Sequence, residues 1–263
     1  MSTVDHLIAE GDELDRLVAD LTPDQWRLAT PAAGWSIAHQ IGHLAWTDEV
    51  ALTAVTDPDS FGAVVAEAAT DPLHFTDITA AQRANLPVAQ LLSQWRAGRS
   101  KLAVALEHLP PDTAIPWFGP PMKPRSMATA RLMETWAHGQ DVADALGVRR
   151  VPTDRLKDIA HLGVRTRTFA YAINDLPLPA AEPLVELTAP SGELWVWGPQ
   201  DATDRITGPA EDFCLAVTQR RELPDLALAA TPGVATEWLT IAQAFAGAPK
   251  AAVRAAHTTE VTQ

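Results

Sequence analysis

Two segments of the chain place histidine and carboxylate side chains at a spacing that suits a divalent metal ion. In METWAHGQD, Glu134 and His138 lie four residues apart, and Asp141 continues the same pattern. A helix would bring such side chains to one face, with Cβ atoms about 5–6 Å apart. One carboxylate and one imidazole at this spacing can bind a divalent cation. The pair is a modest signal by itself, because exposed Glu/His pairs occur by chance on many helices.

The second segment, SIAHQIGHL, carries His39 and His43, again four residues apart. The plainer interpretation of each is a packed or solvated histidine. Either could supply a third ligand if its helix packs against the helix that carries Glu134. Two histidines and one carboxylate leave a coordination position open, which is typical of a catalytic rather than a structural zinc site.

Apolar residues at helical spacing predict the elements that must position these side chains. Ser36 is a suitable N-cap for the helix that carries His43, and Ser126 for the helix that carries Glu134, which should stop at Gly147. The proline-rich stretch 110–124 cannot form a regular helix. The predicted helices cover 3–20, 36–56, 79–109 with a break at Pro87, 126–147 and 153–173.

The pattern changes after Asn174. LVELTAP and ELWVWG are strand-like runs separated by Ser191-Gly192, a hairpin signal, and ATDRITG could add a third strand. Helices are expected over 210–221 and 235–246. We therefore predict a helical bundle over residues 1–175, a small α+β domain over 176–250 and a frayed tail over 251–263.

Composition limits the classes of partner. The 263 residues carry a formal net charge of −13, so nucleic acid and anionic membranes are poor candidate partners. The acidic N-terminus does not resemble a signal peptide, and no apolar run has the length of a membrane span. The one cysteine, Cys214, lies in an apolar stretch and is interpreted as a buried thiol. We expect a cytoplasmic protein, monomeric or homodimeric, that acts on a small molecule.

Other chemistry finds less support. The sequence contains no glycine-rich phosphate loop, no G-x-S-x-G elbow and no C-x-x-C motif. Trp46, Trp117 and Trp136 are expected to lie in or near the proposed site. Tryptophans in such positions are mostly core anchors and only sometimes form the walls of a ligand site.

The segments GWSIAHQIGHLAWTDEVAL and METWAHGQDVADALG resemble motifs of the DinB-like superfamily, in its mycothiol-dependent maleylpyruvate isomerase branch. The resemblance extends over nearly the whole chain and includes a poorly characterised actinobacterial subgroup. It implies a mostly α fold, a DinB-like bundle of the four-helix type followed by a small α+β C-terminal domain. It also implies that His43, Glu134 and His138 are metal ligands. The family has an acidic residue where this chain has His39.

The resemblance assigns further roles. His39 could be a spare ligand, could hold a ligand histidine by a hydrogen bond, or could serve packing alone. Asp141 could hydrogen-bond a ligand histidine, or could equally cap or pair with a neighbouring helix. An arginine late in the helix over 210–221 is associated with the active site of the family, so Arg220 or Arg221 would be the catalytic counterpart. The implied cofactors are one divalent metal, best zinc and alternatively nickel, and mycothiol as the thiol donor.

Three functions are compatible with these residues. The first is a metal-dependent enzyme that activates a low-molecular-weight thiol for isomerisation of, or S-transfer to, a small electrophile. The second keeps the metal without the thiol, as in a lyase, cyclase or hydrolase of a biosynthetic pathway. The third is a non-catalytic protein that binds a metal or a small molecule.

Overall fold

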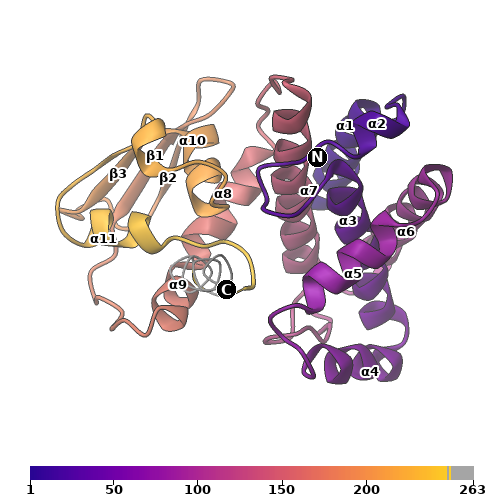
Figure 1. Ribbon diagram of the computed structural model, residues 1–263. Coiled ribbons are helices and arrows are strands. Elements are labelled where there is room, and N and C mark those ends of the chain that lie inside the picture. The colour runs from indigo at the N-terminus through magenta and orange to yellow at the C-terminus, as the bar shows by residue number, and fades with distance from the viewer. Residues whose placement is uncertain (248, 250–263) are drawn as a thin grey trace, which may run out of the picture. The chain divides into compact units, whose positions relative to one another are not determined.

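The computed structural model describes residues 1–247 and 249, and the predicted tail over 251–263 lies outside the described residues. The chain divides into two compact units, Met1–Arg150 and Val151–Gln263 (Figure 1). The first is entirely helical apart from two isolated β-bridges, and the second combines helices with a small sheet. The mostly α fold with a small C-terminal α+β part agrees with the fold class predicted from the sequence.

Four long helices build the first unit. They are α1 (Thr3–Val18), α3 (Ile37–Thr56), α6 (Val88–His108) and α7 (Pro124–Leu146). Helix α3 packs against both α6 and α7, and α1 packs against α7 and α6, so the four form a bundle (Figure 1). The shorter helices are α2 (Pro23–Trp26), α4 (Pro58–Ala68) and α5 (Phe75–Ala84).

Local sequence signals explain where α7 begins and ends. Pro124 occupies the first turn, where its missing N–H is not needed, so the helix starts two residues before the predicted cap at Ser126. Gly147 ends the helix in the left-handed conformation, with φ 66°, as the sequence predicted. The helix predicted over 79–109 is interrupted before Pro87 and becomes α5 and α6.

Helix α3 is the centre of the bundle and is buried along most of its length. Its N-terminal half, through Ile41 and Leu44, joins a core cluster with Trp95 of α6. Its C-terminal half joins a second cluster around Phe61. Gly42 lets α5 approach closely, because a Cβ there would lie 2.9 Å from the carbonyl oxygen of Ala80.

The second unit contains a four-stranded sheet with strand order β2-β1-β3-β4. The strands are β1 (Leu184–Thr188), β2 (Leu194–Trp197), β3 (Arg205–Pro209) and β4 (Ala229–Ala230). Strands β1 and β2 form the hairpin predicted at Ser191-Gly192, and β1 pairs parallel with β3. The helices are α8 (Leu156–Arg165), α9 (Arg167–Ile173), α10 (Ala210–Val217), the 3-10 turn η1 (Leu223–Asp225) and α11 (Val234–Ile241).

The boundary between the two units differs from the predicted one. We expected residues 153–173 to complete the bundle, but this segment forms α8 and α9 of the second unit. Helix α8 packs against α10 and β2, and α9 packs against α11. Helical periodicity shows that a segment has an apolar face, but it does not show which neighbour covers that face. In the part of the chain that the structure describes, no helix is long and apolar enough to cross a membrane.

Candidate metal centre

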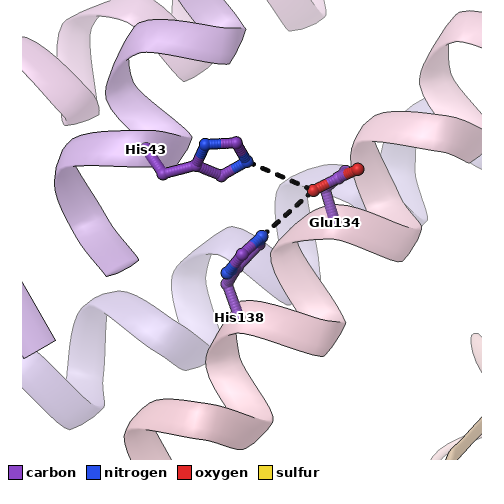
Figure 2. A group of neighbouring side chains, drawn as sticks. All are labelled: His43, Glu134 and His138. Atoms are coloured by element: carbon purple, nitrogen blue, oxygen red, sulfur yellow. Dashed lines mark hydrogen bonds and ion pairs between the residues drawn. The ribbon is translucent and has the colours of Figure 1, made fainter. Parts of the chain in front are cut away.

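His43, Glu134 and His138 meet between α3 and α7. Glu134 Oε2 lies 3.4 Å from His43 Nε2 and 3.1 Å from His138 Nε2 (Figure 2). One donor atom from each residue lies within 4.8 Å of the others, and this is the group that could hold a metal ion among the described residues. Zinc binds nitrogen and oxygen at about 2.0–2.1 Å, which in a tetrahedron separates donors by about 3.3 Å. The two oxygen–nitrogen separations, 3.4 and 3.1 Å, therefore suit a single cation.

The two helices fix these side chains from opposite sides. Glu134 and His138 lie one turn apart on α7, and His43 reaches across from α3 (Figure 2). The side chain of Glu134 is 21% exposed, against 9% for His43 and 11% for His138. The cluster is thus nearly enclosed, and Glu134 is the most exposed of its three side chains.

The charge state of Glu134 suits a ligand. Burial opposes its negative charge, but hydrogen bonds with His138 and His43 outweigh burial and hold the pKa of this carboxyl well below its usual value. Glu134 is therefore ionised at neutral pH. A carboxylate between two imidazoles provides one negative charge and two neutral nitrogen donors for a cation.

A chain of hydrogen bonds sets the tautomer of His138. The Thr30 hydroxyl donates to the carbonyl of Trp35 and accepts from the side-chain amide of Gln40, whose Nε2 lies 2.8 Å away. Gln40 Oε1 is thereby turned to His138, 2.5 Å from Nδ1. Because an amide oxygen only accepts, Nδ1 carries the proton and Nε2 presents its lone pair.

This tautomer provides a test of whether the residues fit a metal. His138 Nε2 faces the carboxylate oxygen of Glu134 at 3.1 Å. Because Nδ1 already carries a proton, Nε2 donates to Glu134 only when His138 is doubly protonated, and without that second proton both atoms present lone pairs. Two such lone pairs need a cation between them, either a proton or a metal ion. The donor set of two imidazoles and one carboxylate therefore fits a divalent metal.

The polar partner of His138 is a residue that the sequence analysis did not consider. Asp141 is buried, but its Oδ2 lies 3.9 Å from His138 Nδ1, farther than Gln40 Oε1 at 2.5 Å. Gln40 lies three residues before His43 on the same helix, which is the spacing of a shared face. That spacing is the sequence signal that could have identified Gln40 as a neighbour of the cluster.

His39 lies at the N-terminus of α3. Its Nδ1 accepts from the backbone N–H of Ser36 at 3.3 Å and lies 2.8 Å from the Ser36 hydroxyl. His39 thus occupies the third position of a capping box whose N-cap is Ser36, the residue predicted to cap this helix. Burial lowers the pKa of His39, with the charge of Asp77 acting in the opposite direction. His39 is not a member of the donor cluster.

Trp35 is a second neighbour that the sequence analysis did not consider. Its ring stacks on that of His138 at a centroid distance of 5.8 Å and lies 5.3 Å from that of His43. The indole N–H donates to Asp77 at 2.8 Å, which holds the ring in place. Trp35 therefore covers the two histidines and reduces their access to water.

A buried ion pair connects the same two helices. Arg131 of α7 donates through Nε to Asp48 of α3 at 3.0 Å and through Nη2 to Thr47 at 2.5 Å. The Arg131 and Asp48 side chains are only 3% and 4% exposed. Arg131 lies three residues before Glu134, so the pair fixes α7 against α3 next to the donor cluster.

Comparison with known proteins identifies the family. The protein-family model described as the mycothiol maleylpyruvate isomerase N-terminal domain matches residues 7–143, which include the three donors. The chain belongs to the mycothiol maleylpyruvate isomerase family. A second model, described as wyosine base formation, matches residues 179–231.

Relatives of this family member include proteins from two strains of Mycobacterium tuberculosis, CDC 1551 / Oshkosh and ATCC 25618 / H37Rv. Each is described as an uncharacterized protein and is 58% identical over 243 residues, covering 92% of this chain and 95% of the relative. Crystal structures of a mycothiol-dependent maleylpyruvate isomerase and of a mutant of it share the fold. Both have a TM-score of 0.57 and cover 88% of this chain and 92% of their own, at 14% and 13% identity respectively.

The cysteine of this family member is unsuited to act as a nucleophile. Cys214 is fully buried in α10, and its thiol contacts the carbonyl of Leu156 at 3.6 Å. Burial raises the pKa of Cys214 well above its usual value, with a further contribution from Glu211. The thiol therefore stays protonated, and the interpretation of Cys214 as a buried structural thiol agrees with the geometry.

Arg220 and Arg221 belong to the second unit. Helix α10 ends at Val217, so both follow the helix instead of ending it as predicted. Gln219 adopts φ 58° and turns the chain at this point. Arg220 donates to the carbonyl of Thr218 at 2.7 Å, and Arg221 donates to the carbonyl of Arg220 at 2.8 Å. Their catalytic role stays a prediction.

Proposed function

We propose that the protein is a divalent-metal-dependent enzyme that activates a low-molecular-weight thiol for reaction with a small electrophile. The observation that supports this most strongly is the donor cluster of His43, Glu134 and His138. Family membership supports the same conclusion, because the structurally similar isomerase is described as mycothiol-dependent.

The three donors would hold the metal, and the surrounding residues would keep them in place. Gln40 fixes the tautomer of His138, and Trp35 shields the histidine rings. Three protein ligands leave a coordination position for an exogenous group. A divalent cation bound there would lower the pKa of a thiol or water and polarise a carbonyl.

The reacting thiol would come from outside the chain. Cys214 is the one cysteine of the sequence, and it is buried with a raised pKa. A mycothiol-like cofactor would therefore supply the sulfur. Addition of that sulfur to an activated double bond, rotation about the resulting single bond and elimination of the same thiol would isomerise the substrate. Attack with loss of a leaving group would give S-transfer.

The alternatives differ in whether they use the thiol or perform catalysis. A thiol-independent lyase, cyclase or hydrolase would use the same donors for water or a carbonyl. A non-catalytic protein would keep the metal without turnover. We favour the thiol-dependent enzyme because its family is defined by mycothiol.

Elemental analysis of the purified protein tests the metal. We expect about one divalent ion, preferably zinc and alternatively nickel, per chain in the wild type. Glu134→Ala and His138→Ala should lose it while remaining folded, as judged by circular dichroism. Full metal occupancy in the variants would refute the ligand assignment.

The thiol requirement is tested separately on the metal-loaded wild type. We expect addition of mycothiol to start turnover of small electrophiles such as maleylpyruvate, with no turnover in its absence. Equal turnover without any thiol would favour the lyase, cyclase or hydrolase. A metal-loaded protein that is inactive under both conditions would favour the binding protein.

A further inference from the structure

Aromatic side chains gather on one side of the donor cluster. Trp46 of α3 contacts Phe75 of α5 edge to face at a centroid distance of 5.4 Å and lies 6.3 Å from Phe118. Behind them, Phe61 and Trp117 stack at 5.9 Å, and both contact Phe118 at 5.4 and 5.2 Å. We call these five residues the aromatic wall.

One member of the aromatic wall contacts His43, a proposed metal ligand. Trp46 lies three residues after His43 on α3, and the two rings are 6.4 Å apart. Through Trp46 the aromatic wall is therefore adjacent to the ring of His43. Trp35 also contacts His43, at a centroid distance of 5.3 Å, so two tryptophan rings contact this histidine.

The wall has a buried layer and an accessible layer. Phe61 is 3% exposed and belongs to the core cluster of the bundle, so packing alone explains it. Phe118 is 38% exposed, and Trp46 and Phe75 are partly exposed. A large accessible aromatic ring that touches other aromatic rings next to a polar cluster offers a surface for an apolar ligand group.

Two cations of the segments that carry the wall have acidic partners. Lys123, in the loop that carries Phe118, donates to Asp112 at 2.7 Å. Arg83 of α5 contacts Glu49 at 2.5 Å and Gln94 at 2.8 Å. The expected preference for an apolar group therefore rests on the aromatic rings themselves.

We propose that the aromatic wall selects the substrate class, namely electrophiles or ligands that carry a planar apolar group, such as an aromatic ring, beside the atom that binds the metal. This inference rests on the proposed function insofar as it requires a metal at the cluster. It assigns a role in specificity to Trp46, which also packs against the core cluster, and to the more exposed Phe118.

The probes are two metal-binding hydroxamates, benzohydroxamate with an aromatic ring and acetohydroxamate with a methyl group. The protein is loaded with Co²⁺, and the visible spectrum of cobalt reports binding of each. We expect benzohydroxamate to bind roughly tenfold more tightly than acetohydroxamate to the wild type. In Trp46→Leu and Phe118→Ala, the preference for benzohydroxamate should fall from roughly tenfold to threefold or less. Cobalt binding should be unchanged in both variants.

Phe169→Ala is the matched control, because Phe169 lies on α9 and is 37% exposed, much like Phe118. It should leave the ratio at its wild-type value. Equal affinities for the two hydroxamates in the wild type would overturn the inference, as would a ratio unchanged in both wall variants. Since Phe118 is more accessible than Trp46, its variant keeps the test valid if Trp46→Leu fails to fold.

The outcome also separates this inference from the proposed function. A low-molecular-weight thiol, 2-mercaptoethanol, should produce a sulfur-to-cobalt charge-transfer band. A protein that prefers benzohydroxamate but gives no band with the thiol would support the wall and contradict thiol activation. A protein that binds no cobalt would overturn both.

Discussion

At the scale of single residues, the donor cluster depends on the side-chain amide of Gln40, which is not itself a metal ligand. Gln40 Oε1 accepts a hydrogen bond from His138 Nδ1, which leaves Nε2 to face the cluster. Gln40 is oriented for this because its NH₂ group donates a hydrogen bond to the Thr30 hydroxyl. Partners of this kind hold ligand histidines in the orientation and tautomer that metal binding needs. Two side chains, Thr30 of the loop and Gln40 of α3, therefore fix the orientation of His138 on α7.

Replacement of Gln40 tests this arrangement. Gln40→Leu removes the acceptor for His138 Nδ1 and should weaken metal affinity by about 10–100-fold without unfolding the bundle. The measurement is competition for zinc with a chromophoric chelator. Gln140→Ala is the control, because Gln140 is similarly buried and pairs with Asp144 instead. Equal loss of affinity in both variants would contradict the role of Gln40.

At the scale of elements, the cluster depends on the contact between α3 and α7. The Arg131–Asp48 pair bridges these helices within the core. An ion pair this deeply buried stabilises little in itself, since both charges lose their hydration, but removal of one partner leaves an unpaired buried charge. The pair thus discriminates strongly against any arrangement in which α7 shifts along α3.

Single and double variants separate these effects. Arg131→Met should lower the free energy of unfolding by about 3–5 kcal/mol, because it leaves Asp48 buried and unpaired. Arg131→Met combined with Asp48→Leu should recover most of this loss. Urea unfolding gives the values. Lys123→Ala serves as the control, since its pair with Asp112 is exposed and should contribute at most about 1 kcal/mol.

In the second unit, a side-chain hydrogen bond joins α9 to α11. The Tyr171 hydroxyl donates to Glu237 at 2.8 Å, and burial together with this bond raises the pKa of Tyr171 to about 12. The folded state retains this proton more strongly than an unfolded chain, whose pKa is about 10. The stabilisation should be complete below about pH 10 and lost as the pH rises towards about 12.

Titration of the tyrosine checks this directly. Because Tyr171 is the one tyrosine of the chain, phenolate absorbance reports it alone. We expect a midpoint near 12 in the folded protein and near 10 in urea. Glu237→Gln should lower the folded midpoint, since it removes the negative charge that opposes ionisation. A folded midpoint near 10 in the wild type would contradict the prediction.

At the scale of the whole molecule, a metal would join two helices that are distant in sequence. His43 and His138 belong to α3 and α7, so a shared cation would act as a cross-link inside the first unit. A ligand that binds only the folded state stabilises it by about 2.7 kcal/mol when its concentration is a hundred times its dissociation constant.

Chelation should therefore lower the thermal stability of the wild type. We expect the midpoint of unfolding of the first unit to fall by about 5–10 °C when a chelator removes the metal. Differential scanning calorimetry resolves this transition from that of the second unit. Glu134→Ala should not respond to the chelator, and an equal response in that variant would show that the effect arises elsewhere.

The second unit should contribute to catalysis without contributing to metal binding. If Arg220 or Arg221 binds an anionic substrate group, its alanine variant should lower kcat/KM by about tenfold or more while the metal content stays at the wild-type value. Elemental analysis and steady-state kinetics with maleylpyruvate give the two quantities. Loss of metal from either variant would instead indicate that the arginines support the fold.

Much of the fold could be predicted from the sequence because the signals are local. Periodic apolar residues, Pro87, Pro124 and Gly147 act through the backbone geometry of their own segments. The break between α5 and α6, the end of α7 and the hairpin of β1 and β2 follow from such signals. The assignment of α8 and α9 to the bundle could not succeed on this basis, because it concerns contacts between distant segments.

For the candidate site, the sequence by itself determined that Glu134 and His138 share a face of one helix, because their spacing matches the helical turn. Spacing alone left His39 and His43 as alternatives, and the resemblance to the family named His43, with His39 and Asp141 as supporting groups. Only the tertiary structure decided that His43 faces Glu134 and that Gln40 is the polar neighbour of His138. Packing of α3 against α7 fixes the rotation of one helix relative to the other, and that rotation is not encoded in the spacing within either helix.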